Sequence, residues 1–152
     1  MYQEKKLGMK WFYFLIYFSL WAGAIFNFIT GVKLYNGSVY ESQGLTAEEV
    51  YSFFPGLSGI DMVFSIIYMV FAIYQIVVRF YLARFKLNAP RMLLLMYLFA
   101  LIVELLYIIV ASVIAKTFLA SAGEIIITIV GNGIMLYANY IYFENRNELF
   151  IR

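Results

Sequence analysis

The chain has 152 residues, of which 64% are hydrophobic and only 13% are charged. Soluble domains average roughly 45–50% apolar and about 25% charged residues, so a water-soluble fold of this length is excluded. The sequence contains no cysteine and no histidine, which excludes disulfides, thiolate or imidazole metal sites, and Ser-His or Cys-His catalysis. We therefore expect a lipid bilayer to surround most of the chain, and we expect no metal or other cofactor.

Four apolar stretches bounded by charged residues are long enough to cross a bilayer as helices, which takes roughly 20 residues each. They predict one all-α domain over residues 1–152, an integral membrane protein built as an antiparallel four-helix transmembrane bundle. The predicted spans cover residues 11–32, 59–84, 90–115 and 122–144, and residues 33–58 form an external loop.

Three helix starts are predicted from a Ser or Thr that is followed three positions later by an acid, which is the spacing of a capping box. The pairs are Thr46 with Glu49, Ser58 with Asp61, and Ser121 with Glu124. The first predicts a short helix on the membrane surface over residues 47–54, and the others predict the starts of spans two and four. Asp61 and Glu124 are then first-turn acids, which stabilise the positive end of a helix dipole.

Nine of the eleven basic residues lie near the two termini or around the connection between spans two and three. Those around the connection are Arg79, Arg84, Lys86 and Arg91. Cytoplasmic loops carry an excess of lysine and arginine, so both termini and this connection are predicted to be cytoplasmic. Its basic residues either only fix this topology or also bind anionic lipid headgroups at the cytoplasmic face.

The first span also imitates a secretory signal, because it has a basic start, an apolar core and the cleavage-like sequence Ala22-Gly23-Ala24. The apolar stretch continues to Val32 without a break, which favours a retained span. Cleavage would leave three spans and the same cytoplasmic C-terminus, so the alternative stays open.

Glu104 lies in the middle of span three, near the predicted bilayer midplane. An acid at this depth costs about 2.5–3.5 kcal/mol on insertion scales, so we expect it to face the bundle interior. Asn132 in span four is predicted at the same depth as its hydrogen-bond partner. Gly131 and Gly133 flank this asparagine and permit either a close helix approach or a local break in the helix.

Two interpretations of these four residues follow. In the first, Glu104, Asn132 and the backbone around the glycines handle a proton or a cation, as at the interrupted helices of transporters. In the second, a protonated Glu104 only bonds Asn132 across a tight helix crossing, a contact worth about 0.6–2 kcal/mol. Asn27 and Gln75, inside the first two spans, are predicted to hold helices together.

No motif indicates an enzyme: the sequence has no Walker loop, no nucleophile elbow and no pair of converging acids. Nucleic-acid binding is not expected either, because the basic residues lie against the membrane. The leading hypothesis is a non-enzymatic accessory, regulatory or assembly component, with another membrane protein or a second copy as its partner. The alternative is a small proton- or cation-coupled transporter with Glu104 as the intramembrane acid.

Several short motifs lie between residues 51 and 150. They are the tail Tyr142-Phe143-Glu144-Asn145-Arg146-Asn147-Glu148-Leu149-Phe150, the stretch Phe54-Pro55-Gly56-Leu57 followed by Asp61, and the pair Arg79-Phe80 and Ala83-Arg84-Phe85. Together they resemble a family of small uncharacterised bacterial membrane proteins with four spans and a tail of the form YF-x-x-R-x-x-LF. The resemblance implies a bacterial cytoplasmic-membrane protein of this architecture and implies nothing about mechanism.

The predicted topology can be tested with reporter fusions. A reporter fused after Arg152 is expected to give a cytoplasmic signal, because the basic residues retain that end inside. A fusion after Gln43, in the predicted external loop, serves as the opposite control. An external signal from the C-terminal fusion would contradict the predicted orientation.

Overall fold

The computed structural model describes residues 8–117 and 121–150, so Lys5, Lys6 and Arg152 of the predicted cytoplasmic tails lie outside the described part. Its regular elements are all helices in these residues. Four of the helical stretches are long and apolar enough to cross a membrane. They cover Lys10–Asn36, Pro55–Ala83, Ala89–Ala115 and Ala122–Glu144. The chain is thus an all-α integral membrane protein in a lipid bilayer, as its composition predicts.

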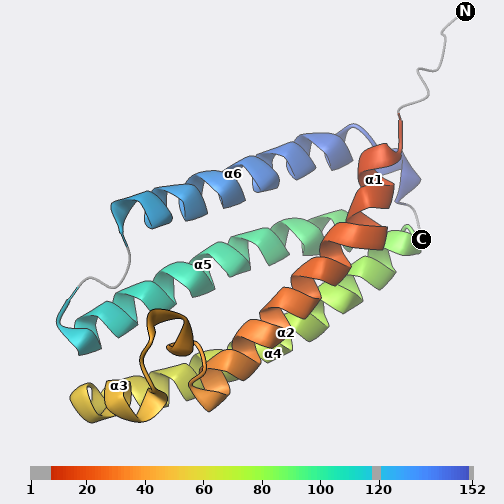
Figure 1. Cartoon of the computed structure of the whole chain (residues 1–152). Coiled ribbons are helices and arrows are strands. Elements are labelled where there is room, and N and C mark those ends of the chain that lie inside the picture. The colour runs from red at the N-terminus through yellow and green to blue at the C-terminus, as the bar shows by residue number, and fades with distance from the viewer. Residues whose placement is uncertain (1–7, 118–120, 151–152) are drawn as a thin grey trace, which may run out of the picture.

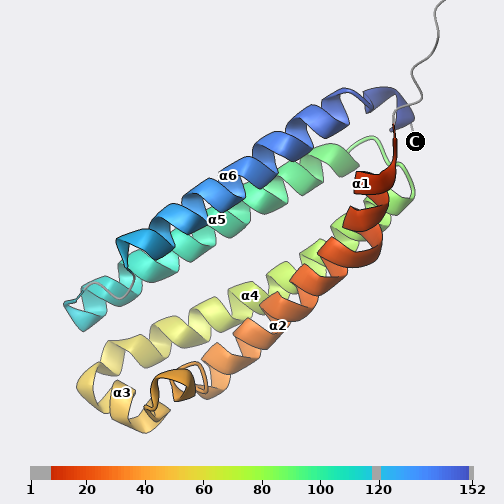
Figure 2. The same ribbon diagram turned by 45° about the horizontal axis from the view of Figure 1, so that its top comes forward.

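The first spanning stretch consists of α1 (Lys10–Phe14), one π-helical turn (Leu15–Ser19) and α2 (Leu20–Asn36). After a 3-10 turn (Glu41–Gln43) come α3 (Ala47–Phe53), α4 (Pro55–Ala83), α5 (Ala89–Ala115), α6 (Ala122–Glu144) and a last 3-10 turn (Asn147–Leu149). Figures 1 and 2 show two antiparallel pairs, α2 beside α4 and α5 beside α6. We call the end that holds α1, the α4–α5 turn and the C-terminal turn the terminal end. The opposite end, with α3, is the loop end.

The helix starts agree with two of the three predicted capping boxes. Thr46 and Ser121 are N-caps whose side chains accept the backbone N–H of Glu49 and Glu124. The box predicted at Ser58 is wrong, because α4 already begins at Pro55. Proline suits the first helical turn, where its missing N–H leaves no hydrogen bond unmade. Asp61 therefore lies inside α4 instead of at its start.

Two glycines shape the first helical pair. Gly37 ends α2 in the left-handed conformation with a φ of 76°, and a Cβ at this position would collide with the Cβ of Ala47. At Gly31 a Cβ would approach the Ser65 carbonyl oxygen of α4 to 2.9 Å. The absence of a side chain at Gly31 therefore lets α2 and α4 pack closely, as small residues do in membrane helices.

The terminal end holds the largest buried cluster. Phe12 stacks on Phe85 with ring centroids 5.0 Å apart, and Phe150 contacts both rings and Phe143. Aromatic pairs of this kind contribute about 0.5–1.5 kcal/mol beyond their burial. The beginning of the chain, the α4–α5 turn and the last residues of the described chain are thereby held together.

A buried asparagine joins α1 to α6 beside this cluster. Asn139 is 0% exposed, and its Oδ1 accepts the Trp11 indole N–H at 3.0 Å. Its own amide donates to the Met135 carbonyl one turn earlier in α6. Because Asn139 is fully buried, its polar atoms depend on protein groups for their hydrogen bonds.

Replacing Asn139 with alanine is expected to cost about 1–2 kcal/mol, because the Trp11 N–H loses its buried acceptor. Thermal unfolding in detergent, followed by tryptophan fluorescence, measures the loss as a lower midpoint. Asn145→Ala is a matched control: Asn145 is exposed and its amide also bonds the carbonyl four residues earlier. Equal midpoints for the two variants would contradict a stabilising role of the Trp11–Asn139 bond.

Candidate functional site

A cavity of about 180 Å³ lies among the four spans, and we call it the central pocket. Every span contributes at least one polar side chain to its lining. These side chains are Asn27 from α2, Tyr68 and Gln75 from α4, Tyr97 and Glu104 from α5, and Asn132 from α6. The pocket thus contains two of the four residues singled out from the sequence, Glu104 and Asn132, together with the two polar residues predicted to hold helices together.

Glu104 is half-buried and bonded to α6, although not through the predicted partner. Its Oε1 accepts the Thr128 hydroxyl at 3.0 Å, and the Asn132 amide donates to the Thr128 carbonyl at 2.9 Å. Thr128 therefore stands between the two residues. Sequence reasoning missed it because a threonine can satisfy its hydroxyl within its own helix, so that it signals no external partner.

The two glycines beside Asn132 do not have the predicted role. α6 runs unbroken through Gly131 and Gly133, which contradicts the interrupted-helix interpretation. A Cβ at either position would meet no atom within 4 Å, so the glycines make no tight crossing inside the chain. In lipid, breaking a helix leaves backbone groups unpaired at several kcal/mol each, whereas glycine in a helix costs only about 1 kcal/mol.

An amide pair forms another part of the pocket wall. The Asn27 amide donates to the Gln75 Oε1 and to the Gly23 carbonyl, both at 2.9 Å. Gln75 is buried, and a Cβ on Gly23 would lie 3.0 Å from its amide nitrogen. The pair joins α2 to α4, as expected for residues that hold helices together, and it also lines the pocket.

The basic residues at the terminal end have two different environments. Arg79 is half-buried, donates from Nε to the Ile16 carbonyl of the π-helical turn at 3.1 Å, and lies over the rings of Trp21 and Phe80. The other three predicted lipid-facing or topology residues are exposed: Arg84, Lys86 and Arg91. Arg79 thus joins α4 to the first span, whereas the others are free to meet the surroundings.

The loop end contains a second buried acid that sequence reasoning placed wrongly. Asp61 is 0% exposed, and its carboxyl accepts three tyrosine hydroxyls. They belong to Tyr40 at 2.6 Å, Tyr51 at 2.9 Å and Tyr107 at 3.0 Å. We call these four residues the tyrosine cluster. Because these three hydrogen bonds come from the loop, from α3 and from α5, the cluster fixes all three elements onto α4.

Burial, together with the hydrogen bond to Asp61, raises the pKa of Tyr51 to about 12. The same two causes, burial first, raise the pKa of Tyr40. Both hydroxyls therefore keep their protons and keep donating at neutral pH. No sequence motif marks this cluster, because its tyrosines lie 21, 10 and 46 residues from Asp61.

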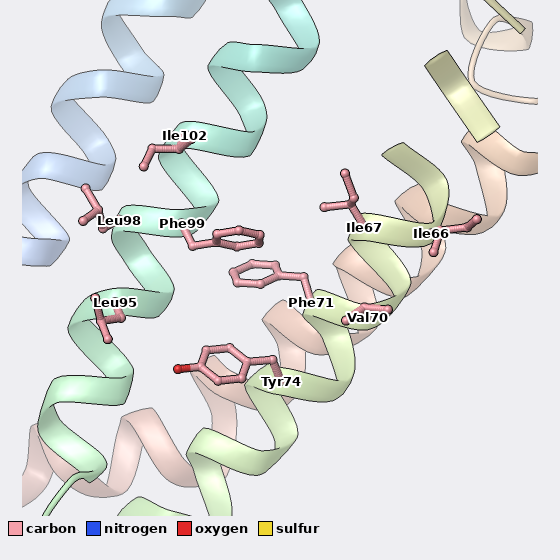
Figure 3. A pocket seen from close by; sticks show the side chains of 9 residues that line it. All are labelled: Ile66, Ile67, Val70, Phe71, Tyr74, Leu95, Leu98, Phe99 and Ile102. Atoms are coloured by element: carbon pink, nitrogen blue, oxygen red, sulfur yellow. The ribbon is translucent and has the colours of Figure 1, made fainter. Parts of the chain in front are cut away.

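An apolar groove of about 610 Å³ runs between α4 and α5 (Figure 3). Its lining consists of Ile66, Ile67, Val70, Phe71, Tyr74, Leu95, Leu98, Phe99 and Ile102. The rings of Phe71 and Phe99 face each other across it, with centroids 5.4 Å apart. Phe71 also lines the central pocket, so one ring belongs to the walls of both cavities. Lipid-facing apolar surface of this kind is ordinary for a membrane helix pair.

The alkaline titration of Tyr51 predicts when the loop contact weakens. An unfolded tyrosine ionises near pH 10, whereas Tyr51 ionises near pH 12 in the folded protein. The contribution of the Tyr51 hydroxyl to the free energy of unfolding is therefore complete below pH 10 and is lost as pH rises through 12. We expect the unfolding midpoint of the wild type to exceed that of Tyr51→Phe at pH 8, and the difference to vanish by about pH 12. A difference that stays constant over this range would contradict the assignment.

Comparison with protein-family models, with curated proteins and with solved structures finds no match for this chain. The resemblance of its short motifs to a bacterial four-span family therefore stays a prediction. Within residues 8–117 and 121–150, no three acidic, histidine or cysteine side chains gather as metal ligands would.

Proposed function

We propose that the protein is a small proton- or cation-coupled transporter and that the central pocket is its binding site, with Glu104 as the intramembrane acid. The observation that carries the proposal is the convergence of six polar side chains from all four spans on one cavity. A purely structural Glu104 needs one partner, and Thr128 already supplies it. The amides and the two tyrosines are therefore not required as hydrogen-bond partners of Glu104. Polar groups that surround an intramembrane acid are typical of ion and proton pathways.

The chemistry of the pocket suits a proton or a small hard cation. Thr128 binds the Oε1 of Glu104, and the Glu104 side chain lines the cavity. Carboxyl and amide oxygens are the ligands that hard cations prefer, and Asn132 and Asn27 bring amide groups to the same cavity. A proton on Glu104 makes the acid neutral, which lowers the cost of its position in the bilayer.

The charges support an orientation with both termini in the cytoplasm, and the resemblance of the short motifs implies that the membrane is a bacterial cytoplasmic membrane. The terminal end carries the exposed side chains of Arg84, Lys86 and Arg91, whereas the exposed acids Glu48 and Glu49 lie at the loop end. This distribution follows the positive-inside rule. The three exposed basic residues are also placed to bind anionic lipid headgroups, each contributing about 1 kcal/mol.

Proton flux into proteoliposomes tests the transporter proposal. With a potassium diffusion potential as the driving force and a trapped pH-sensitive dye as the readout, the wild type is expected to exceed empty liposomes. Glu104→Gln is expected to reduce flux at least tenfold, because an amide cannot take up the proton. Glu124→Gln is the matched control: this acid is exposed at the start of α6, where glutamine also caps a helix.

Flux that is unchanged in Glu104→Gln would contradict the proposal. The variant must elute as a single detergent-solubilised species with a wild-type unfolding midpoint, so that lost flux is not lost folding. Repeating the assay with sodium or potassium as the only cation gradient separates a proton guest from a metal-cation guest.

The second candidate is a non-enzymatic accessory, regulatory or assembly component. The observation that favours it is the exposure of α6, whose apolar stretch is 6% buried within the chain against 33% for α4. If the wild-type protein shows no flux above that of empty liposomes, the transporter proposal is contradicted and the accessory function remains. It is contradicted in turn if mild detergents repeatedly extract a lone monomer from the native membrane.

A further inference from the structure

We propose that the tyrosine cluster is the loop-side entrance of a proton path to Glu104, and that the path runs from Asp61 through Tyr107 and Tyr68. The inference rests on the proposed function, since it assumes that Glu104 takes up a proton in the central pocket. It assigns a functional role to Asp61, which is predicted from the sequence only as a first-turn acid that stabilises a helix end.

The two carboxyl oxygens of Asp61 face two different sets of groups. Oδ2 accepts the hydroxyls of Tyr40 and Tyr51, which come from the loop and from α3 and are half-exposed. Oδ1 accepts the hydroxyl of Tyr107, which comes from the membrane-spanning α5. Asp61 therefore connects hydroxyls at the protein surface to a hydroxyl inside the bundle, although the acid itself is 0% exposed.

The next two tyrosines lie together inside the bundle. Tyr107 and Tyr68 pack against the same buried cluster of Leu34, Phe64 and Val103. The Tyr107 ring lies edge-on to Phe64 with centroids 5.2 Å apart. Tyr68 follows Asp61 by seven residues in α4, which is two helical turns and therefore the same helix face.

The last step joins Tyr68 to Glu104. Both side chains line the central pocket. A cavity of about 180 Å³ has room for several water molecules, which bridge polar groups when two or more of them line the space. With a rise of 1.5 Å per residue, Asp61 lies about 9 Å and Tyr68 about 20 Å along α4 from its start, so the path leads toward the bilayer centre.

The chemistry of the path is a relay in which no tyrosine is left charged. Asp61 takes a proton from the loop side, and the Tyr107 hydroxyl, which donates to Asp61 at rest, turns its proton toward Tyr68. Asp61 then passes its proton to the Tyr107 oxygen, while Tyr107 releases its own hydroxyl proton toward Tyr68. Tyr68 does the same toward the pocket, and one proton reaches the Glu104 carboxylate. A hydroxyl can accept and donate at once, which makes this exchange feasible.

The titratable groups around both acids are compatible with the relay. Those that contact Asp61 are the tyrosines of the cluster, and those that line the pocket with Glu104 are Tyr68 and Tyr97. Among the described residues, no lysine or arginine lines the pocket or bonds Asp61, so none competes for the proton.

Tyr68→Phe tests the path, because it keeps the packed ring and removes only the hydroxyl. In the proton-flux assay the variant is expected to lose at least tenfold, and Asp61→Asn is expected to lose as much. Tyr74→Phe is the matched control, since its hydroxyl donates to the Met92 carbonyl and lies outside the path. Flux that is unchanged in Tyr68→Phe but abolished in Glu104→Gln would overturn the path and leave the proposed function standing.

A second readout does not depend on transport. Dicyclohexylcarbodiimide reacts with protonated carboxyls in membranes, so labelling of Glu104, measured by mass spectrometry, reports its proton. In proteoliposomes sorted for one orientation by a C-terminal tag, wild-type labelling is expected to follow the pH on the loop side, and Tyr68→Phe labelling is not. Wild-type labelling that ignores the loop-side pH would overturn the path, and flux unchanged in Glu104→Gln would overturn both proposals.

Discussion

A polar group inside the hydrocarbon of a bilayer cannot form hydrogen bonds with water, and the arrangement of this protein follows from that constraint. Backbone groups are satisfied within helices, which explains why the four spans are helical and why α6 stays unbroken through two glycines. Side chains must find partners across helices. Asn139, Gln75, Glu104 and Asp61 each do so, and these four contacts connect different pairs of elements.

The partners are not distributed evenly along the bundle. The terminal end is held mainly by packed aromatic rings around Phe12, and the loop end by hydroxyl bonds to Asp61. Between them lies the central pocket, where polar side chains meet without filling the space. Apolar side chains in a core normally pack until such a space is filled. The incomplete packing is what makes the middle of the bundle a better candidate for function than either end.

Much of this fold could be predicted because charge and length are properties of single stretches of sequence. The four spans, the capping boxes at Thr46 and Ser121 and the position of Glu104 inside α5 all follow from residues close together in the chain. The partners could not be predicted, because they depend on helix rotation. Uniformly apolar spans give little sign of their inner face, so Thr128 was missed beside Glu104. Asp61 was misplaced because Pro55 starts α4 earlier than the Ser58 motif indicates.

The bond between Trp11 and Asn139 joins residues 128 positions apart in the chain. Membrane helices insert one after another and associate afterwards, so the first helix waits in the lipid until the fourth has been made. An indole tolerates this delay, because it settles at the interface with its N–H in the headgroup region. The side-chain oxygen of Asn139 becomes fully buried only when the bundle has closed around it. The order of synthesis thus presents the donor, Trp11, first and its acceptor, Asn139, last.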